Sequence, residues 1–144
     1  MYAREYLTAG INARWLEPHK ARHAYAYAVK YSHPKRYGLN EQSVANIDRL
    51  IIESYSVAKA WLAQRLPSTG TVQVIYSESE VAVVEASIFV SRWDEIFLPA
   101  RDDAVVIHNL SSTVLFYSHE EELEVGQRKD LLPNTGDRNE PSSI

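Results

Sequence analysis

The longest stretch of helical periodicity in the chain runs from Asn40 to Leu66. Apolar residues recur there at steps of three and four positions: Val44, Ile47, Ile51, Ala58, Trp61 and Leu62. This spacing is typical of an α-helix that buries one face. Asn40 suits the N-cap of such a helix, and Pro67 suits its end. The pattern therefore predicts one long core helix over about residues 41–66.

Two shorter segments before it also favour helices. In residues 2–16, Tyr2 and Tyr6 stand four positions apart, as neighbours on one helical face do. Residues 20–31 alternate aromatic residues with alanines, a pattern that fits either a strand or a helix. Alanine is the best helix former and is poor in strands, so a helix is favoured there, while the strand alternative stays open.

After Gly70 the pattern changes to β-branched, alternating runs that are typical of strands. They cover residues 71–77, 81–90, 104–109 and 113–118. The connections between the first two runs and between the last two are short enough for antiparallel hairpins. We therefore expect an α+β fold, in which N-terminal helices and the long helix pack on an antiparallel sheet of about four strands over residues 71–118.

Chain length and composition indicate a single ordinary domain. The chain has 144 residues, of which 45% are hydrophobic, and a domain of that size can bury a sufficient core. Residues 1–127 are predicted to form this domain. Residues 128–144 contain Pro133, Asn134 and Gly136 and few apolar positions, so we expect a flexible C-terminal tail.

Charge and missing motifs exclude several classes of function. Fifteen Lys and Arg against nineteen Asp and Glu give a net charge of −4, which argues against direct binding of nucleic acid by phosphate neutralisation. Cysteine is absent, which excludes disulfide scaffolds and cysteine-ligated metals. The chain lacks the glycine-rich phosphate and dinucleotide motifs, so no cofactor is predicted. With neither a signal peptide nor a run of apolar residues long enough to span a bilayer, a cytoplasmic location without membrane contact is expected.

Three charged clusters interrupt the predicted strands, at residues 92–95, 101–103 and 119–122. A hairpin of residues 104–109 and 113–118 would bring Asp102 and Asp103 at its open end close to His119 and Glu120. Carboxylates and an imidazole can hold a divalent cation that activates water. A small metal-dependent hydrolase or nuclease is therefore one alternative. His19 and His23 have helical metal-ligand spacing, but Pro18 places His19 at the helix start, which disfavours a second metal site.

The same clusters also suit a surface that binds another protein. Several like charges attract a basic partner and orient it, and tryptophan is a frequent interface anchor. The predicted partner-binding residues are Glu78, Glu80, Trp93, Asp94, Asp102, Asp103, His119, Glu120, Glu121 and Glu122.

In small size, acidity and lack of catalytic motifs, the chain resembles bacterial immunity proteins in general character, without a shared motif. The resemblance implies a non-enzymatic inhibitor that neutralises a cognate toxin, such as a basic nuclease, through this acidic face. A homo-oligomeric structural or regulatory subunit, paired through exposed strand edges, is a second alternative.

Overall fold

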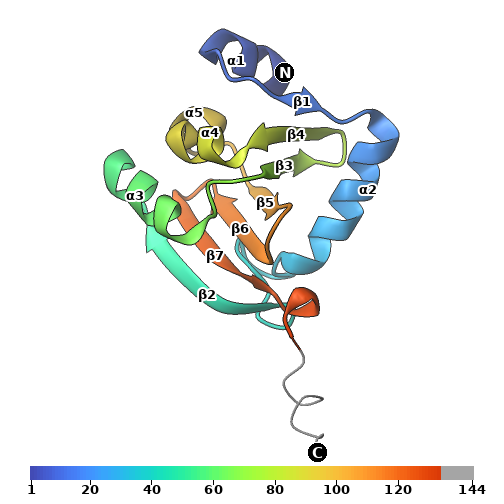
Figure 1. Ribbon diagram of the computed structural model, residues 1–144, viewed down its shortest axis with the longest axis vertical. Coiled ribbons are helices and arrows are strands. Elements are labelled where there is room, and N and C mark those ends of the chain that lie inside the picture. Colours follow the sequence, from blue (N-terminus) through green and yellow to red (C-terminus); the bar gives the residue numbers. More distant parts are fainter. Residues whose placement is uncertain (134–144) are drawn as a thin grey trace, which may run out of the picture.

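A single antiparallel sheet of seven strands, in the order β1-β4-β3-β5-β6-β7-β2, organises the fold (Figure 1). The structure is a computed structural model that describes residues 1–133. The strands are β1 (Arg14–Trp15), β2 (Val44–Ile51), β3 (Thr71–Ser77), β4 (Glu80–Glu85), β5 (Ala104–His108), β6 (Thr113–Ser118) and β7 (Glu122–Arg128). The helices are α1 (Tyr2–Ala9), α2 (Pro18–Ala28), α3 (Tyr55–Arg65), α4 (Ala86–Ser91) and α5 (Trp93–Ile96), with 3-10 turns η1 (Val29–Tyr31) and η2 (Lys129–Leu131).

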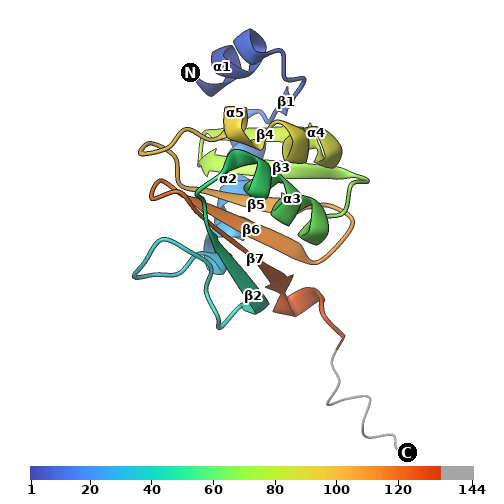
Figure 2. The same cartoon turned by 90° about the vertical axis from the view of Figure 1, so that its left-hand side faces the viewer.

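Helices cover both faces of the sheet, so there are two hydrophobic cores. Helices α3, α4 and α5 lie on one face, and α2 lies on the other (Figure 2). The first core centres on Leu62, Phe89 and Leu115. In the second core, Ala21 and Ala24 present only methyl groups, which lets α2 approach the sheet closely. Every residue of β5 and β6 is buried, as expected for strands covered on both faces.

The long helix predicted over residues 41–66 is wrong, because that segment is the strand β2 followed by the shorter helix α3. Asn46 adopts a φ of 56° and forms a bulge at which the register against β7 shifts. The extra residue turns both Val44 and Ile47 toward the second core. The bulged strand therefore has apolar residues three positions apart, which is also the spacing of a helix. Ser54 then caps α3 by accepting a hydrogen bond from the Val57 amide at 3.4 Å.

The sheet has seven strands where about four were predicted. β3 and β6 have the predicted bounds, and both predicted hairpins form. The run at 81–90 divides, because the strand ends at Glu85 and α4 begins at Ala86. The missed strands are β1, β2 and β7. The segment left open at 20–31 is helical.

The ordered fold continues beyond residue 127. Arg128 ends β7 with 5% of its surface exposed, and η2 follows it. Residues 134–144 of the predicted tail lie outside the described residues. Among residues 1–133, no helix combines the length and the apolar character needed to cross a membrane.

Candidate functional site at one end of the sheet

The strand directions gather the predicted acidic residues at one end of the sheet. β3 and β6 each pair antiparallel with β5, so their C-terminal ends point the same way. The turns after β3 and after β6, and the segment before β5, therefore meet at that end, which lies on the left in Figure 2. We call it the acidic end and define it by Glu78, Glu80, Asp103, His119, Glu120, Glu121 and Glu122.

Asp103 and His119 are in direct contact at the acidic end, as the predicted hairpin implies. Asp103 Oδ1 accepts a hydrogen bond from the His119 amide at 2.9 Å and lies 2.9 Å from His119 Nδ1. The hydrogen bond to Asp103 raises the pKa of His119. The ring of Tyr37 packs edge-on against the imidazole at a centroid distance of 4.7 Å. Together they form a polar and aromatic corner with a titratable group.

Asp102 is buried and serves the fold. Its carboxylate accepts four hydrogen bonds: from the Tyr2 hydroxyl at 2.7 Å, the Leu98 amide at 2.8 Å, and Arg101 Nε and Nη2 at 2.8 and 2.9 Å. These donors use the acceptor capacity of both oxygens, so a metal ion would have to displace them. Over residues 1–133, no group of three or more His, Asp or Glu is placed to hold a metal ion.

Trp93 also lies inside the fold, with 3% of its surface exposed. Its ring packs edge-on against Tyr55 at 5.4 Å, and its indole nitrogen donates to the Tyr55 carbonyl at 3.4 Å. Residues 86–96 form α4 and α5, whose apolar side faces the sheet. The prediction that Trp93 and Asp102 contact a partner is therefore wrong, because both side chains are buried in the fold. Asp94 is half-buried on α5.

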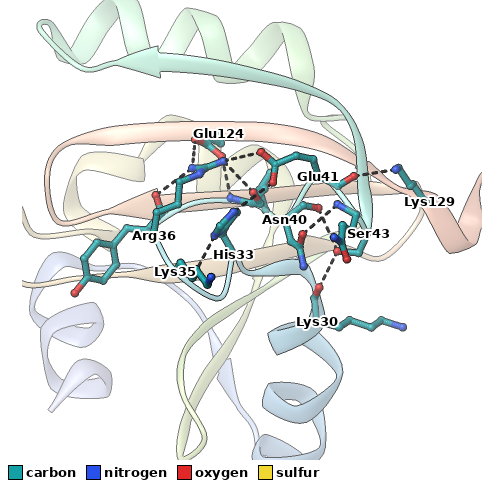
Figure 3. Close-up of polar contacts among 12 residues, drawn as sticks. Lys30, His33, Lys35, Arg36, Asn40, Glu41, Ser43, Glu124 and Lys129 are labelled. Atoms are coloured by element: carbon teal, nitrogen blue, oxygen red, sulfur yellow. Dashed lines mark hydrogen bonds and ion pairs between the residues drawn. The ribbon is translucent and has the colours of Figure 1, made fainter.

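Tyr37 supplies an exposed aromatic side chain at this end, and the sequence reasoning missed it. Its exposed fraction is 54%, and its loop, residues 32–43, joins η1 to β2. The buried carboxylate of Glu124 anchors this loop (Figure 3), accepting from Arg36 Nη1 at 2.9 Å and from the Leu39 amide at 2.8 Å. The available signal was an aromatic residue set among turn formers, Pro34 to Gly38.

Further contacts fix the same loop from both sides. Ser43 Oγ donates to the Lys30 carbonyl at 2.7 Å, and Lys129 Nζ donates to the Glu41 carbonyl at 2.8 Å (Figure 3). A Cβ on Gly38 would lie 2.0 Å from Arg36 Nη1 and 2.8 Å from a carboxylate oxygen of Glu124. A side chain at position 38 would have to displace the ends of Arg36 and Glu124, so the glycine lets the backbone pass close to the ion pair that anchors the loop of Tyr37.

The carboxylates of the acidic end differ in how far they are compensated. Glu122 forms an ion pair with Arg49. Within residues 1–133, the side chains of Glu78 and Glu120 form no ion pair, and both residues are exposed. Both carboxylates therefore face solvent without a direct ion pair, although Lys35, Arg36 and Arg49 line the same pocket as Glu120.

No protein-family model, no curated protein and no solved structure matches the chain.

Proposed function

We propose that this protein binds a basic protein partner through its acidic end and inhibits that partner, in the manner of a bacterial immunity protein that neutralises a toxin. The observation that carries the proposal is the meeting of exposed carboxylates from separate turns with Tyr37 on an anchored loop. Exposed carboxylates speed association with a basic surface and orient it. A tyrosine on a fixed loop adds an amphipathic anchor at little entropic cost.

The alternatives receive less support. Asp102 is one of the four residues of the hydrolase hypothesis, with Asp103, His119 and Glu120, and its carboxylate already accepts hydrogen bonds from Arg101, Tyr2 and the Leu98 amide. For self-assembly through strand edges, the long edge strand is β2. It carries a bulge and the charged residues Asp48 and Arg49, and such features oppose edge-to-edge pairing.

The proposal can be tested by capture and kinetics with two matched double variants. One is Glu78→Gln with Glu120→Gln at the acidic end. The other is Glu17→Gln with Glu85→Gln, which removes the same charge from exposed residues elsewhere. Immobilised wild-type protein and both variants are exposed to lysate of the source organism, and captured proteins are identified by mass spectrometry.

We expect a basic protein that the wild type and the control variant capture and the acidic-end variant loses. With that protein purified, the acidic-end variant should associate about tenfold more slowly at low salt, because steering by charge acts mainly on association. The purified partner should also lose its activity when the wild type is added. Equal capture by the two double variants, or a partner that stays active when bound, would contradict the proposal.

A further inference from the structure

A large cavity lies at the opposite end of the sheet from the acidic end. It has a volume of about 1270 Å³ and lies between one side of α2, from His19 to Tyr27, and the sheet. Its walls come from the end of β5, the following turn at residues 109–112 and the last residue of β7. Pockets of roughly 300–1,000 Å³ accommodate small organic ligands, so the space suffices for one.

The fixed charges that line this cavity are all positive. Arg14, Lys20 and Arg128 contribute cations, and His19 and His23 add two imidazoles at the start of α2. No Asp or Glu is among the lining residues, although the chain as a whole carries a net charge of −4. A concave wall with charges of one sign concentrates the field and attracts an anion.

The side chain of Arg128 is buried in the wall of the cavity and is held there by hydrogen bonds. Its exposed fraction is 5%. Its guanidinium donates to the carbonyls of His108, Ser111 and Ser112 at 2.9, 2.6 and 3.3 Å, and to the Tyr27 hydroxyl at 2.9 Å. All four acceptors are neutral, and within residues 1–133 Arg128 forms no ion pair.

The geometry of Arg128 leaves one donor for a ligand. An arginine side chain has five N–H donors, and the four bonds leave one N–H on Nη1 without an acceptor among residues 1–133. The carboxylate of Asp130 reaches Arg128 only through the hydroxyls of Tyr31 and Tyr27. A buried cation without a direct ion pair is costly, whereas an anion in the cavity would contact it directly. The four bonds hold the guanidinium in place, so binding requires little reorganisation.

The rest of the lining suits an organic body attached to the anionic group. The ring of Tyr27 and the side chains of Leu16, Leu110 and Ile107 supply apolar surface. Ser111, Ser112 and Asn109 add hydrogen-bonding groups beside them. A free inorganic anion would use the cations and leave this apolar wall without a contact.

We propose that this cavity binds a small phosphorylated organic molecule of the nucleotide type. Its phosphates lie against Arg14, Lys20 and Arg128, and its organic body lies on the wall formed by Tyr27 and Leu110. This site is separate from the acidic end and does not depend on the function proposed for that end.

Isothermal titration calorimetry with pyrophosphate, ADP and adenosine tests the proposal on the full chain. At about 0.05 M salt, where screening of charges is weak, ADP should bind more tightly than pyrophosphate, and adenosine should not bind. The exposed residues Arg14 and Lys20 allow substitutions that leave the core intact. Arg14→Gln and Lys20→Gln should each weaken ADP binding by about tenfold, since each removes a charge-assisted contact.

Arg22→Gln and Lys59→Gln are the matched controls, because both residues are exposed and neither lines the cavity. Each control should bind ADP as the wild type does. The proposal is overturned by any of three results. These are no binding of either phosphate compound, equal losses in cavity and control variants, and binding of a short single-stranded RNA without binding of ADP. Equal affinity for pyrophosphate and ADP would overturn the assignment to an organic phosphate.

Discussion

Replacing Asp102 by asparagine should destabilise the fold. It should not change how the melting temperature responds to divalent cations. The carboxylate is buried, and it receives donors from its own loop, through the Leu98 amide and Arg101, and from the N-terminal helix, through Tyr2. Asp102→Asn preserves the shape of the side chain, but it removes the charge and turns one acceptor into an N–H₂ donor that faces other donors.

The expected loss in the free energy of unfolding is about 3 kcal/mol. Hydrogen bonds to a charged group contribute roughly 1.5–3 kcal/mol each, but four such values cannot be added, because the donors share one acceptor group. Removing one partner of a buried ion pair costs about 3–5 kcal/mol. The lower end applies here, since the Arg101 side chain is 28% exposed and water can partly replace its lost partner. For a chain of this size, the melting temperature should fall by about 6–12 °C.

Urea and thermal unfolding followed by circular dichroism measure this loss, and two variants serve as controls. Tyr2→Phe removes one of the four donors and should cost about 1.5 kcal/mol, the lower end of the range for a hydrogen bond to a charged group. Asp103→Asn, at a carboxylate that is 32% exposed, should cost less than about 1 kcal/mol. A loss below about 1 kcal/mol for Asp102→Asn would refute the reasoning from burial. The reasoning would also be refuted if Mg²⁺ or Mn²⁺ raised the melting temperature of the wild type but not that of Asp102→Asn.

Three further predictions concern the candidate site and the core. Gly38→Ala should cost about 1–3 kcal/mol in urea unfolding, because its Cβ would lie 2.8 Å from Glu124 Oε1; a variant as stable as wild type would show that the loop is loosely held. In an NMR pH titration, the pKa of His119 should lie above its ordinary value of about 6.5 and fall in Asp103→Asn. The stabilisation from this pair is fully present below about pH 6.5 and is lost as the pH rises through the folded-state pKa; a pKa unchanged by Asp103→Asn would contradict it. Trp93→Ala should lose about 3–5 kcal/mol in urea unfolding, and a loss typical of a surface residue would contradict its placement in the core.

Local signals were sufficient to predict the central hairpins. β3 and β6 are both rich in β-branched and aromatic residues, and each is bounded by short polar turns. Both determinants act over a few residues, so the strand bounds Thr71–Ser77 and Thr113–Ser118 were predictable. The antiparallel pairing of residues 104–109 with 113–118 then predicts that Asp103 lies beside His119, and the two side chains are in contact.

The missed strands depend on contacts that are remote in the sequence. In β2, the bulge at Asn46 opposes Gly126 of β7, where a Cβ would lie 2.5 Å from Val44. The helical appearance of the spacing arises from this pairing, which the segment itself does not reveal. β7 contains the buried residues Glu124 and Arg128. In the sequence, charged residues at these positions suggest a segment exposed to solvent. Their hydrogen-bonding partners lie in other segments of the chain, such as Leu39 and Tyr27, so only the folded chain explains their burial.

The candidate site was predicted in part for the same reason. Neighbouring residues can point in different directions, so Asp102 is buried while Asp103 reaches the surface. The position of Tyr37 depends on the contact of Arg36 with Glu124, 88 positions away. A sequence pattern identifies which residues carry charge, but burial and orientation decide which of those charges a partner can meet.

The acidic end and the cavity lie at opposite ends of β5, which allows the two proposals to be tested independently. Asp103 directly precedes this strand and His108 ends it, so they are about 16 Å apart at roughly 3.3 Å per residue. That separation exceeds the Debye length of about 8 Å at physiological salt, and substitutions so far apart usually have additive effects. Glu78→Gln with Glu120→Gln should therefore leave ADP affinity unchanged, and Lys20→Gln should leave partner capture unchanged. If either substitution abolished both activities at physiological salt, one occupant would have to span the two sites, and the description of two separate sites would fail.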